Sequence, residues 1–262
     1  MGGARDPRQR FTDRVDNYVR WRPRYPASLL GLLRKRCGLL PEHVVVDAGS
    51  GTGFLSEPFL QNGNRVFGVE PNAAMREAAE RLLASYPAFE SVAGSAEATG
   101  LPERSADFVA AGQAFHWFDP PAARREFRRI LKPEGWVVLV WNDRRTEATA
   151  FLRDYEELLQ RFGTDYGAVS QKNVTPSTLL SFYGRDGYAE EVLENAQAFD
   201  LEGLQGRLLS SSYAPGPGHP DHLPMLRALR EIFEAHAEEG KVTFVYDTRV
   251  LMGHLSPERA EG

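Results

Sequence analysis

The chain is poor in cysteine and has no long apolar run. Its one cysteine, Cys37, excludes an intramolecular disulfide, a zinc site built from several thiolates and an iron–sulfur cluster. No stretch of about 18 apolar residues is present, and the first residues lack the apolar segment of a secretion signal. These absences predict a cytoplasmic protein with no membrane span, no metal and no redox chemistry of its own.

Positive charge is also scarce over the whole chain. The 31 lysine and arginine residues face 36 aspartate and glutamate residues, which gives a net charge of −5. Such a chain has no overall field that attracts nucleic acid or an acidic membrane surface, so neither is expected as a partner. Residues 1–36 differ, because they hold ten basic and three acidic residues. A solvated helix face explains that stretch most simply, and a polyanion site is the alternative.

What the sequence does contain is the composition of an ordinary folded protein, with 262 residues, 42% of them hydrophobic and 26% charged. From residue 44 to residue 141, short apolar runs alternate with amphipathic segments. Strands are expected over 44–46, 65–70, 89–93, 106–111 and 136–141, with helices over 54–60, from Asn72 to Leu83, and from Asp119 to the turn at Lys132–Gly135. This alternation predicts the α/β class and a doubly wound parallel sheet, in which ligands bind at the carboxyl ends of the strands.

The second half of the chain is predicted to be more helical. Helices are expected over 147–162, from Thr175 onward and over 221–240, and strands over 191–199 and 241–251. No repeat or linker interrupts the chain, so we predict a single domain. Its expected parts are an N-terminal cap helix (1–36), a core (37–142), a helical lid (143–188) and C-terminal strands with a helix (189–262).

A glycine-rich turn follows the first predicted strand. Gly49, Gly51 and Gly53 are spaced i, i+2, i+4, whereas a dinucleotide fingerprint needs its third glycine at i+5, which is Phe54 here. Glycines let a ligand approach the backbone closely. Glu70 ends the next predicted strand, where a carboxylate can accept hydrogen bonds from both hydroxyls of a ribose. The spacing therefore favours a nucleoside-type ligand other than a dinucleotide.

The run from Val45 to Gly53 resembles the first motif of the class I S-adenosylmethionine-dependent methyltransferases, and the resemblance extends over roughly residues 10–142. It implies a Rossmann-like, mostly parallel seven-stranded sheet with the last strand antiparallel, and S-adenosylmethionine as the cofactor of the 37–142 core. Gly94–Glu97 stands where the family often has Gly-Asp-Ala-Glu, with Ser95 in place of the aspartate. The cofactor-binding residues that the resemblance implies in this core are Asp47, Gly49, Ser50, Gly51, Gly53, Glu70, Pro71, Asn72, Met75, Ser95, Ala96, Glu97 and Gln113.

The acceptor is expected beyond the fourth strand, at Gln113–Phe118. His116 is a candidate general base for a hydroxyl or carboxylic acid acceptor, and the alternative is an aromatic wall with no proton transfer. Asp119–Pro121 is interpreted as the start of a helix, which argues against methylation of planar amino groups. The candidate residues of this region are His116 and Gln113 for catalysis and His116, Trp117 and Trp141 for substrate binding.

Upstream, Tyr18, Trp21, Arg22 and Tyr25 share helical spacing. Their segment is similar to the N-terminal segment of small-molecule methyltransferases related to the trans-aconitate methyltransferases, which implies that it closes over the cofactor through Tyr18 and Arg22. The guanidinium of Arg22 suits the carboxylate of the cofactor or of an acidic substrate. The alternative is an amphipathic helix that packs its aromatic side chains on the sheet.

The predicted function is therefore methyl transfer from S-adenosylmethionine to a small molecule, by O-methylation of a carboxylic acid or hydroxyl. A nicotinamide-dependent oxidoreductase and a non-catalytic protein that binds S-adenosylmethionine are the alternatives. Methylation of nucleic acid depends only on the basic residues 1–36 and is opposed by the net charge. His219 and His222 lack a third ligand and are interpreted as loop residues rather than a zinc site.

Overall fold

The computed structural model describes residues 19–164, 166 and 174–256. Its strands are β1 (Val44–Ala48), β2 (Arg65–Val69), β3 (Phe89–Val92), β4 (Ala106–Gly112), β5 (Leu131–Arg144), β6 (Ala189–Phe199) and β7 (Val242–Gly253). Its helices are α2 (Ser28–Cys37), α3 (Ser56–Gln61), α4 (Ala73–Leu82), α5 (Pro120–Ile130), α6 (Ala150–Phe162), α7 (Pro176–Tyr183), α8 (Leu201–Leu209) and α9 (His222–His236), with a 3-10 turn, η3 (Phe115–Trp117). None of the helices in these ranges is long and apolar enough to cross a membrane.

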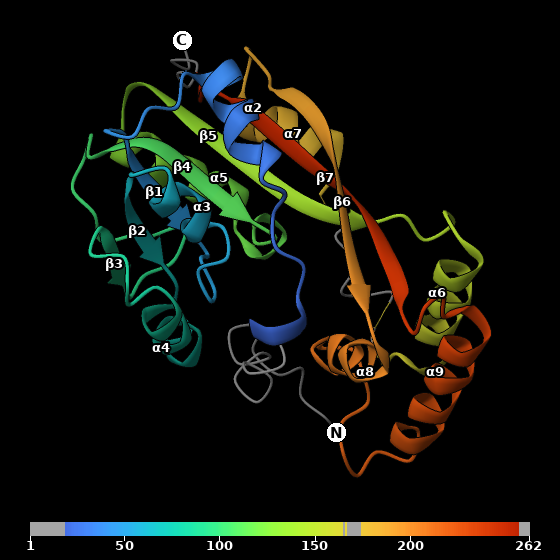
Figure 1. The fold of residues 1–262 in the computed structure, drawn as a ribbon. Helices are drawn as coiled ribbons and strands as arrows, with labels where there is room; N and C mark the ends of the chain where they lie inside the picture. The colour runs from blue at the N-terminus through green and yellow to red at the C-terminus, as the bar shows by residue number, and fades with distance from the viewer. Residues whose placement is uncertain (1–18, 165, 167–173, 257–262) are drawn as a thin grey trace.

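The strands form one seven-stranded sheet in the order β3-β2-β1-β4-β5-β7-β6 (Figure 1). The first five strands pair in parallel, and β7 inserts antiparallel between β5 and β6. The predicted doubly wound sheet with an antiparallel last strand is confirmed. The order reverses at β1 and β4, so the carboxyl ends of these two neighbours define the switch point where such sheets bind ligands.

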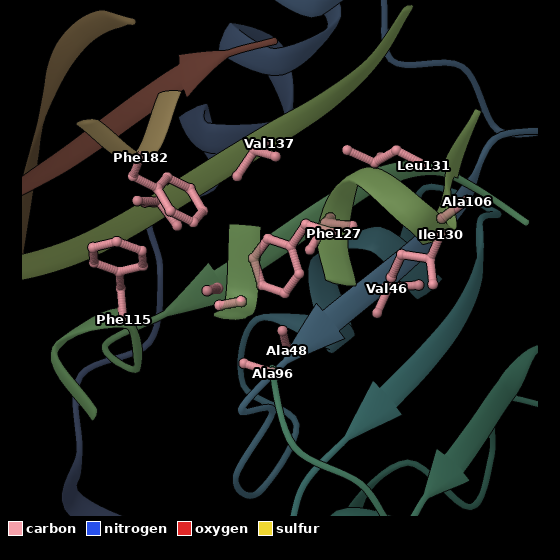
Figure 2. Close-up of a cluster of buried hydrophobic side chains, with 14 of the residues drawn as sticks. Val46, Ala48, Ala96, Ala106, Phe115, Phe127, Ile130, Leu131, Val137 and Phe182 are labelled. Atoms are coloured by element: carbon pink, nitrogen blue, oxygen red, sulfur yellow. The ribbon is translucent and has the colours of Figure 1, made fainter. Parts of the chain in front are cut away.

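Both faces of the sheet are covered by helices, which explains the unbroken apolar runs of its strands. Val45 packs with α2 and α3 on one face, and Val46 packs with α5 and α7 on the other. Figure 2 shows the second cluster, in which three phenylalanine rings converge. The Phe182 ring lies 4.7 Å from that of Phe115 and 6.0 Å from that of Phe127, edge to face. This packing fixes η3, which follows β4, against α5 and α7.

Three predicted helix starts match side-chain caps in the structure, whereas α6 begins at Ala150, three residues after its predicted start, and ends at Phe162 as predicted. The side chains of Asn72, Asp119 and Thr175 accept hydrogen bonds from backbone N–H groups three residues later, so the predicted starts of α4, α5 and α7 are confirmed. The predicted end of α5 is wrong. The helix stops at Ile130, and Lys132–Gly135 forms a bulge inside β5, because Leu131 already pairs with β4.

A third apolar cluster lies away from the central strands. In Figure 1, β6 and β7 extend beyond the rest of the sheet and carry α6, α8 and α9 at their far end. Side chains of these three helices pack with Phe199, Phe244 and Tyr246 of the two strands. The predicted lid over 143–188 is therefore split, since α6 packs with α9 in this cluster while α7 packs on α5 at the central sheet. Helix α2 overlaps the end of the predicted N-terminal cap helix (1–36), whereas α8 was not predicted.

Candidate functional site

A cavity of about 1120 Å³ opens at the carboxyl ends of β1, β2 and β4 and extends toward α6 and α8. Most of the residues singled out from the sequence line it. They are Arg22, Asp47, Gly49, Ser50, Gly51, Glu70, Pro71, Asn72, Met75, Ser95, Ala96, Glu97, Gln113, His116, Trp117 and Trp141. Gly53 is not among the lining residues, and Tyr18 lies outside the described part of the chain.

The glycine turn connects β1 to α3 and forms the floor of this cavity. Gly49 and Ser50 donate their N–H groups to the carbonyl of Val69, at 2.8 and 3.1 Å, which ties the turn to β2. Gly51 has a φ of 55°, and no described atom would lie within 4 Å of a Cβ built on it. Gly53 has a φ of 84°, and a Cβ there would also lie 2.6 Å from the side chain of Leu83, so both backbone conformation and packing favour glycine.

Glu70 joins the turn to the residues after β2. One carboxylate oxygen accepts the N–H of Gly51 at 3.0 Å and the other accepts the N–H of Asn72 at 2.8 Å. The side chain is buried, and burial raises the pKa of Glu70 despite these two hydrogen bonds. A carboxylate has about four acceptor positions, so two remain for donors such as the hydroxyls of a ribose.

Asp47 is a fully buried carboxyl in the cavity wall. Its Oδ2 accepts a hydrogen bond from the hydroxyl of Ser56 at 2.7 Å, and its Oδ1 has no partner among the described residues. Burial raises the pKa of Asp47 to about 7, and the carboxylate of Glu70 adds to this rise. A buried carboxyl of this kind fits a cationic ligand, and S-adenosylmethionine carries both an ammonium and a sulfonium.

The segment after β3 forms the next part of the wall. Ser95 and Ala98 exchange backbone hydrogen bonds at 3.1 Å, and the carboxylate of Glu97 accepts the N–H of Asp119 at 2.9 Å. Glu97 therefore holds the start of α5 in place. Met75 is 4% exposed and contributes an apolar surface beside Pro71. An apolar side chain next to polar backbone groups suits a flat heteroaromatic ring such as adenine.

Gln113 stands at the end of β4 with a φ of 56°, a conformation that is uncommon for residues other than glycine. Its N–H donates to the carbonyl of Val140 at 2.9 Å, and its side-chain amide donates to the carbonyl of Asn142 at 3.3 Å. Such strain costs on the order of 1 to 3 kcal/mol and is concentrated at functional sites. The surroundings of β4 and β5 thus hold this amide at the middle of the cavity.

His116 lies in η3, beside Trp117. Burial lowers the pKa of His116 to about 4, and its Nδ1 is buried without a partner among the described residues. The imidazole is therefore neutral at pH 7, and no described carboxylate orients it. A base with such a low pKa removes protons weakly, so these properties favour the aromatic wall over the general base.

The N-terminal segment lies across the cavity, but the predicted helix through Tyr25 is wrong. Residues 19–21 are helical and the chain leaves the helix before Pro23, because proline disfavours helix at the residue before it. The Trp21 ring fills a notch on α8, where its Nε1 would lie 2.0 Å from a Cβ built on Gly206. Arg22 lines the cavity and donates to the carbonyl of Ser210 at 3.2 Å.

The far end of the cavity was missed by the sequence analysis. Its lining carries three arginines and three tyrosines together with two carboxylates, which are Arg144, Arg207, Arg249, Tyr166, Tyr213, Tyr246, Asp143 and Glu156. These residues come from β5, α6, α8, β7 and the connections between them, so no contiguous motif unites them. The only local signal was Arg207, an arginine at a buried position of the apolar helix α8.

The chain resembles known proteins over the same core. Residues 46–139 match the methyltransferase domain family. An uncharacterized methyltransferase of Mycobacterium tuberculosis is 35% identical over 161 residues, which are 61% of this chain and 62% of the relative. An uncharacterized methyltransferase of Schizosaccharomyces pombe is 26% identical over 202 residues, 77% of each chain. This chain thus spans less than two thirds of the mycobacterial relative.

Two solved structures share the fold. One, named for a type II methyltransferase of Anaeromyxobacter dehalogenans, has a TM-score of 0.66 at 23% identity and covers 91% of this chain and 100% of its own. The other, named for a methyltransferase of an antibiotic biosynthesis pathway in Anabaena variabilis, has a TM-score of 0.63 at 22% identity and covers 90% and 99%. Residues 46–139 thus resemble the methyltransferase domain family, and the strand order is that of the methyltransferase fold which the two solved structures share.

Proposed function

We propose that this protein transfers a methyl group from S-adenosylmethionine to a small-molecule acceptor by O-methylation of a carboxylic acid or a hydroxyl. The observation that carries the proposal is the continuity of the cavity. The same cavity is lined by the glycine turn and Glu70 at one end, by Gln113 and Trp141 in the middle, and by a polar recess at α8. A nucleoside-type cofactor and a small acceptor can therefore meet inside it, at the carboxyl end of β4.

When bound, S-adenosylmethionine supplies a methyl group that is already activated for displacement. The residues of this chain then have to align the acceptor and exclude water. Trp141, 4% exposed, gives the middle of the cavity an apolar wall, and the buried ring of Phe115 supports it from the core, edge to face at 6.3 Å. Gln113 offers an amide at a position fixed by its strained backbone.

Of the two acceptor classes, a carboxylic acid fits His116 better. A carboxylic acid with an ordinary pKa is ionised at pH 7 and needs no base, whereas a hydroxyl must lose a proton during the transfer. The low pKa of His116 leaves a weak base at this place. In this proposal His116, Trp117 and Trp141 form the wall around the acceptor, and Gln113 helps to orient it.

The other residues of the cavity are given roles according to where they lie in it. The residues of 37–142 that line it would bind the cofactor, and the later elements would shape the acceptor end. Gly53 does not line the cavity and would act through the backbone conformation and packing of the turn. The likeness of the N-terminal segment to the trans-aconitate methyltransferases stays a prediction.

Calorimetric titration of the full chain with S-adenosylmethionine, S-adenosylhomocysteine and NADH, side by side, tests the cofactor. We expect micromolar binding of the first two and none of NADH. Release of S-adenosylhomocysteine is then measured with a panel of carboxylic acids and with their alcohol counterparts as matched controls. The acids are expected to react and the alcohols to react slowly or not at all.

Each of the other outcomes would assign a different function to the protein. Binding of NADH alone would make the chain an oxidoreductase despite its glycine spacing. Binding of S-adenosylmethionine without turnover of any acid, alcohol, amine or thiol would favour a non-catalytic protein. Turnover of alcohols alone would reassign the acceptor and require a base other than the neutral His116.

A further inference from the structure

Arg207 is a buried cation at the far end of the cavity. It projects from α8 into the lining and is only 5% exposed. Its Nη1 donates to the hydroxyl of Ser211 at 3.2 Å, and its guanidinium carbon lies 5.9 Å from the ring centroid of Phe244. Its Nε is buried without a partner, and no carboxylate of the described residues forms an ion pair with it. A charge buried in this way is costly unless something else neutralises it.

The neighbouring Arg144 and Arg249 form ion pairs with carboxylates. Arg144 forms an ion pair with Glu156 and donates to the hydroxyl of Tyr166 at 3.1 Å, so its charge is balanced. Arg249 pairs with two carboxylates, those of Asp143 and Glu190. Within the described residues, Arg207 therefore differs from Arg144 and Arg249 in having no carboxylate partner, although it lines the same cavity.

Tyr213 reports how closely the cations converge. Burial raises the pKa of its hydroxyl, but the charges of Arg207 and Arg22, a hydrogen bond with Ser211 and the charge of Arg144 together outweigh burial, so the pKa of Tyr213 is lowered. Three guanidinium groups thus act on one phenol, while Glu156 is the carboxylate of the recess that pairs with one of them. Guanidinium groups and phenolic hydroxyls are both hydrogen-bond donors, and together they form a lining that accepts an oxyanion.

We propose that Arg207, with Arg22, Arg144 and Tyr213, binds an oxyanion of the acceptor, a carboxylate or a phosphate group distinct from the atom that receives the methyl group. We call these four residues the arginine pocket. This inference rests on the proposed function, because it assigns the far end of the same cavity to the acceptor. It narrows the substrate class to small molecules that carry an anchoring anion in addition to the methylated oxygen.

Within this pocket, Arg207 is the residue expected to select an oxyanion as the ligand. A planar guanidinium can bind both oxygens of a carboxylate or two oxygens of a phosphate. Because Arg207 packs against the aromatic ring of Phe244 and is surrounded by the apolar cluster of α6, α8 and α9, its position is fixed before any ligand binds. Preorganisation of this kind reduces the entropy lost on binding.

The test uses the full chain with saturating S-adenosylhomocysteine and two probe anions, succinate and inorganic phosphate, with succinamide as the uncharged analogue of succinate. The variant is Arg207→Met, which keeps an apolar side chain of similar length. The matched control is Arg65→Met, at an exposed arginine that pairs with Glu90 far from the cavity lining. Calorimetry and the thermal shift caused by each probe are the readouts.

We expect at least one anion to bind the wild type and Arg65→Met, and succinamide to bind neither. Arg207→Met should bind that anion roughly 10- to 100-fold more weakly, as expected for loss of a charged hydrogen-bond donor. Its affinity for S-adenosylhomocysteine should stay within about twofold of wild type. Preference for succinate or for phosphate would identify the anchoring group.

Three results would overturn the inference. They are failure of both anions to bind the wild type, equal anion binding by Arg207→Met, and loss of S-adenosylhomocysteine affinity in that variant, which would assign Arg207 to the carboxylate of the cofactor. Should Arg207→Met not fold, Arg207→Lys keeps the charge without the planar fork and is expected to weaken anion binding about tenfold. If S-adenosylhomocysteine does not bind the wild type, the proposed function fails, and anion binding still tests Arg207 independently.

Discussion

The two ends of the cavity are built from different kinds of sequence. At the cofactor end, the contiguous turn from Asp47 to Gly53 and the single acid Glu70 stand at the ends of adjacent parallel strands. At the proposed acceptor end, the arginine pocket combines side chains from residue 22 to residue 213, carried by the N-terminal segment, β5, α8 and the connection after α8. The first end depends on backbone geometry within one βαβ unit, and the second depends on how distant elements pack. Under the proposed function, acceptor preference could therefore change without disturbing the turn.

The largest effect is expected from Gly51→Val, which tests the cofactor end alone. Valine disfavours the φ of 55°, and its side chain would occupy the space above the turn. We expect calorimetry to detect no binding of S-adenosylhomocysteine, a loss of at least about 100-fold, or roughly 3 kcal/mol. Gly31→Ala is the control, because a Cβ there meets no described atom within 4 Å and α2 gains a better helix former. Near-normal binding by Gly51→Val would mean that the ligand does not approach this turn.

The second prediction concerns Asp47→Asn, in which function and stability change in opposite directions. Folding raises the pKa of Asp47 from 3.8 to about 7, so the folded state favours the protonated carboxyl. The contribution of this group to folding stability is therefore lost as the pH rises from about 4 through 7. That difference corresponds to roughly 4 kcal/mol at most. We expect Asp47→Asn to melt higher than wild type at pH 8, with a smaller difference at pH 5, and to bind S-adenosylmethionine at least about tenfold more weakly.

Asp107→Asn is the comparison variant in the same experiment, because the pKa of Asp107 is shifted in the opposite direction to that of Asp47. The pKa of Asp107 is lowered because its hydrogen bonds to Lys132 and to the N–H of Val44 outweigh burial. The contribution of Asp107 to folding stability is therefore present at pH 5 and at pH 8, and it is lost only when the pH falls through that lowered pKa. Asp107→Asn should melt lower than wild type at both values, with unchanged cofactor binding. Parallel behaviour of the two variants would contradict the assignment of Asp47.

The difference between the two ends of the cavity also explains which features could be predicted from the sequence. The strand order, the helix starts and the cofactor end follow from local signals, such as the valines of β1 and the side-chain caps at Asn72 and Asp119. The break in the N-terminal helix was also readable in principle, since Pro23 precludes its continuation. The positions of Arg207 and Trp21 were not, because each depends on a surface formed only when α8 packs beside β6.

The third prediction tests the link between the two ends, which is the N-terminal segment. The Trp21 ring fills the notch at Gly206, so Gly206→Ala should displace it without altering the segment itself. We expect Trp21→Ala and Gly206→Ala each to weaken S-adenosylhomocysteine binding about tenfold, or roughly 1.4 kcal/mol. The double variant should be no weaker than either, because both changes remove one contact. Gly216→Ala, where a Cβ meets no described atom within 4 Å, should bind normally. Additive losses would show that the notch does not hold the segment.

The smallest effect is expected from His116→Asn, at the boundary between the two ends. The asparagine keeps a polar group of smaller size, and the imidazole that it replaces has a pKa of about 4 and no described carboxylate beside it. A carboxylate acceptor needs no base at pH 7, so we expect kcat to fall less than about tenfold, within 1.4 kcal/mol. The pH dependence of kcat should keep the same shape between pH 6 and 8 in both proteins. A fall of about 100-fold or more, with loss of an acidic limb present in wild type, would make His116 a general base and favour a hydroxyl acceptor. That result would leave the arginine pocket intact, since the anion and the methylated oxygen are bound at different places in the cavity.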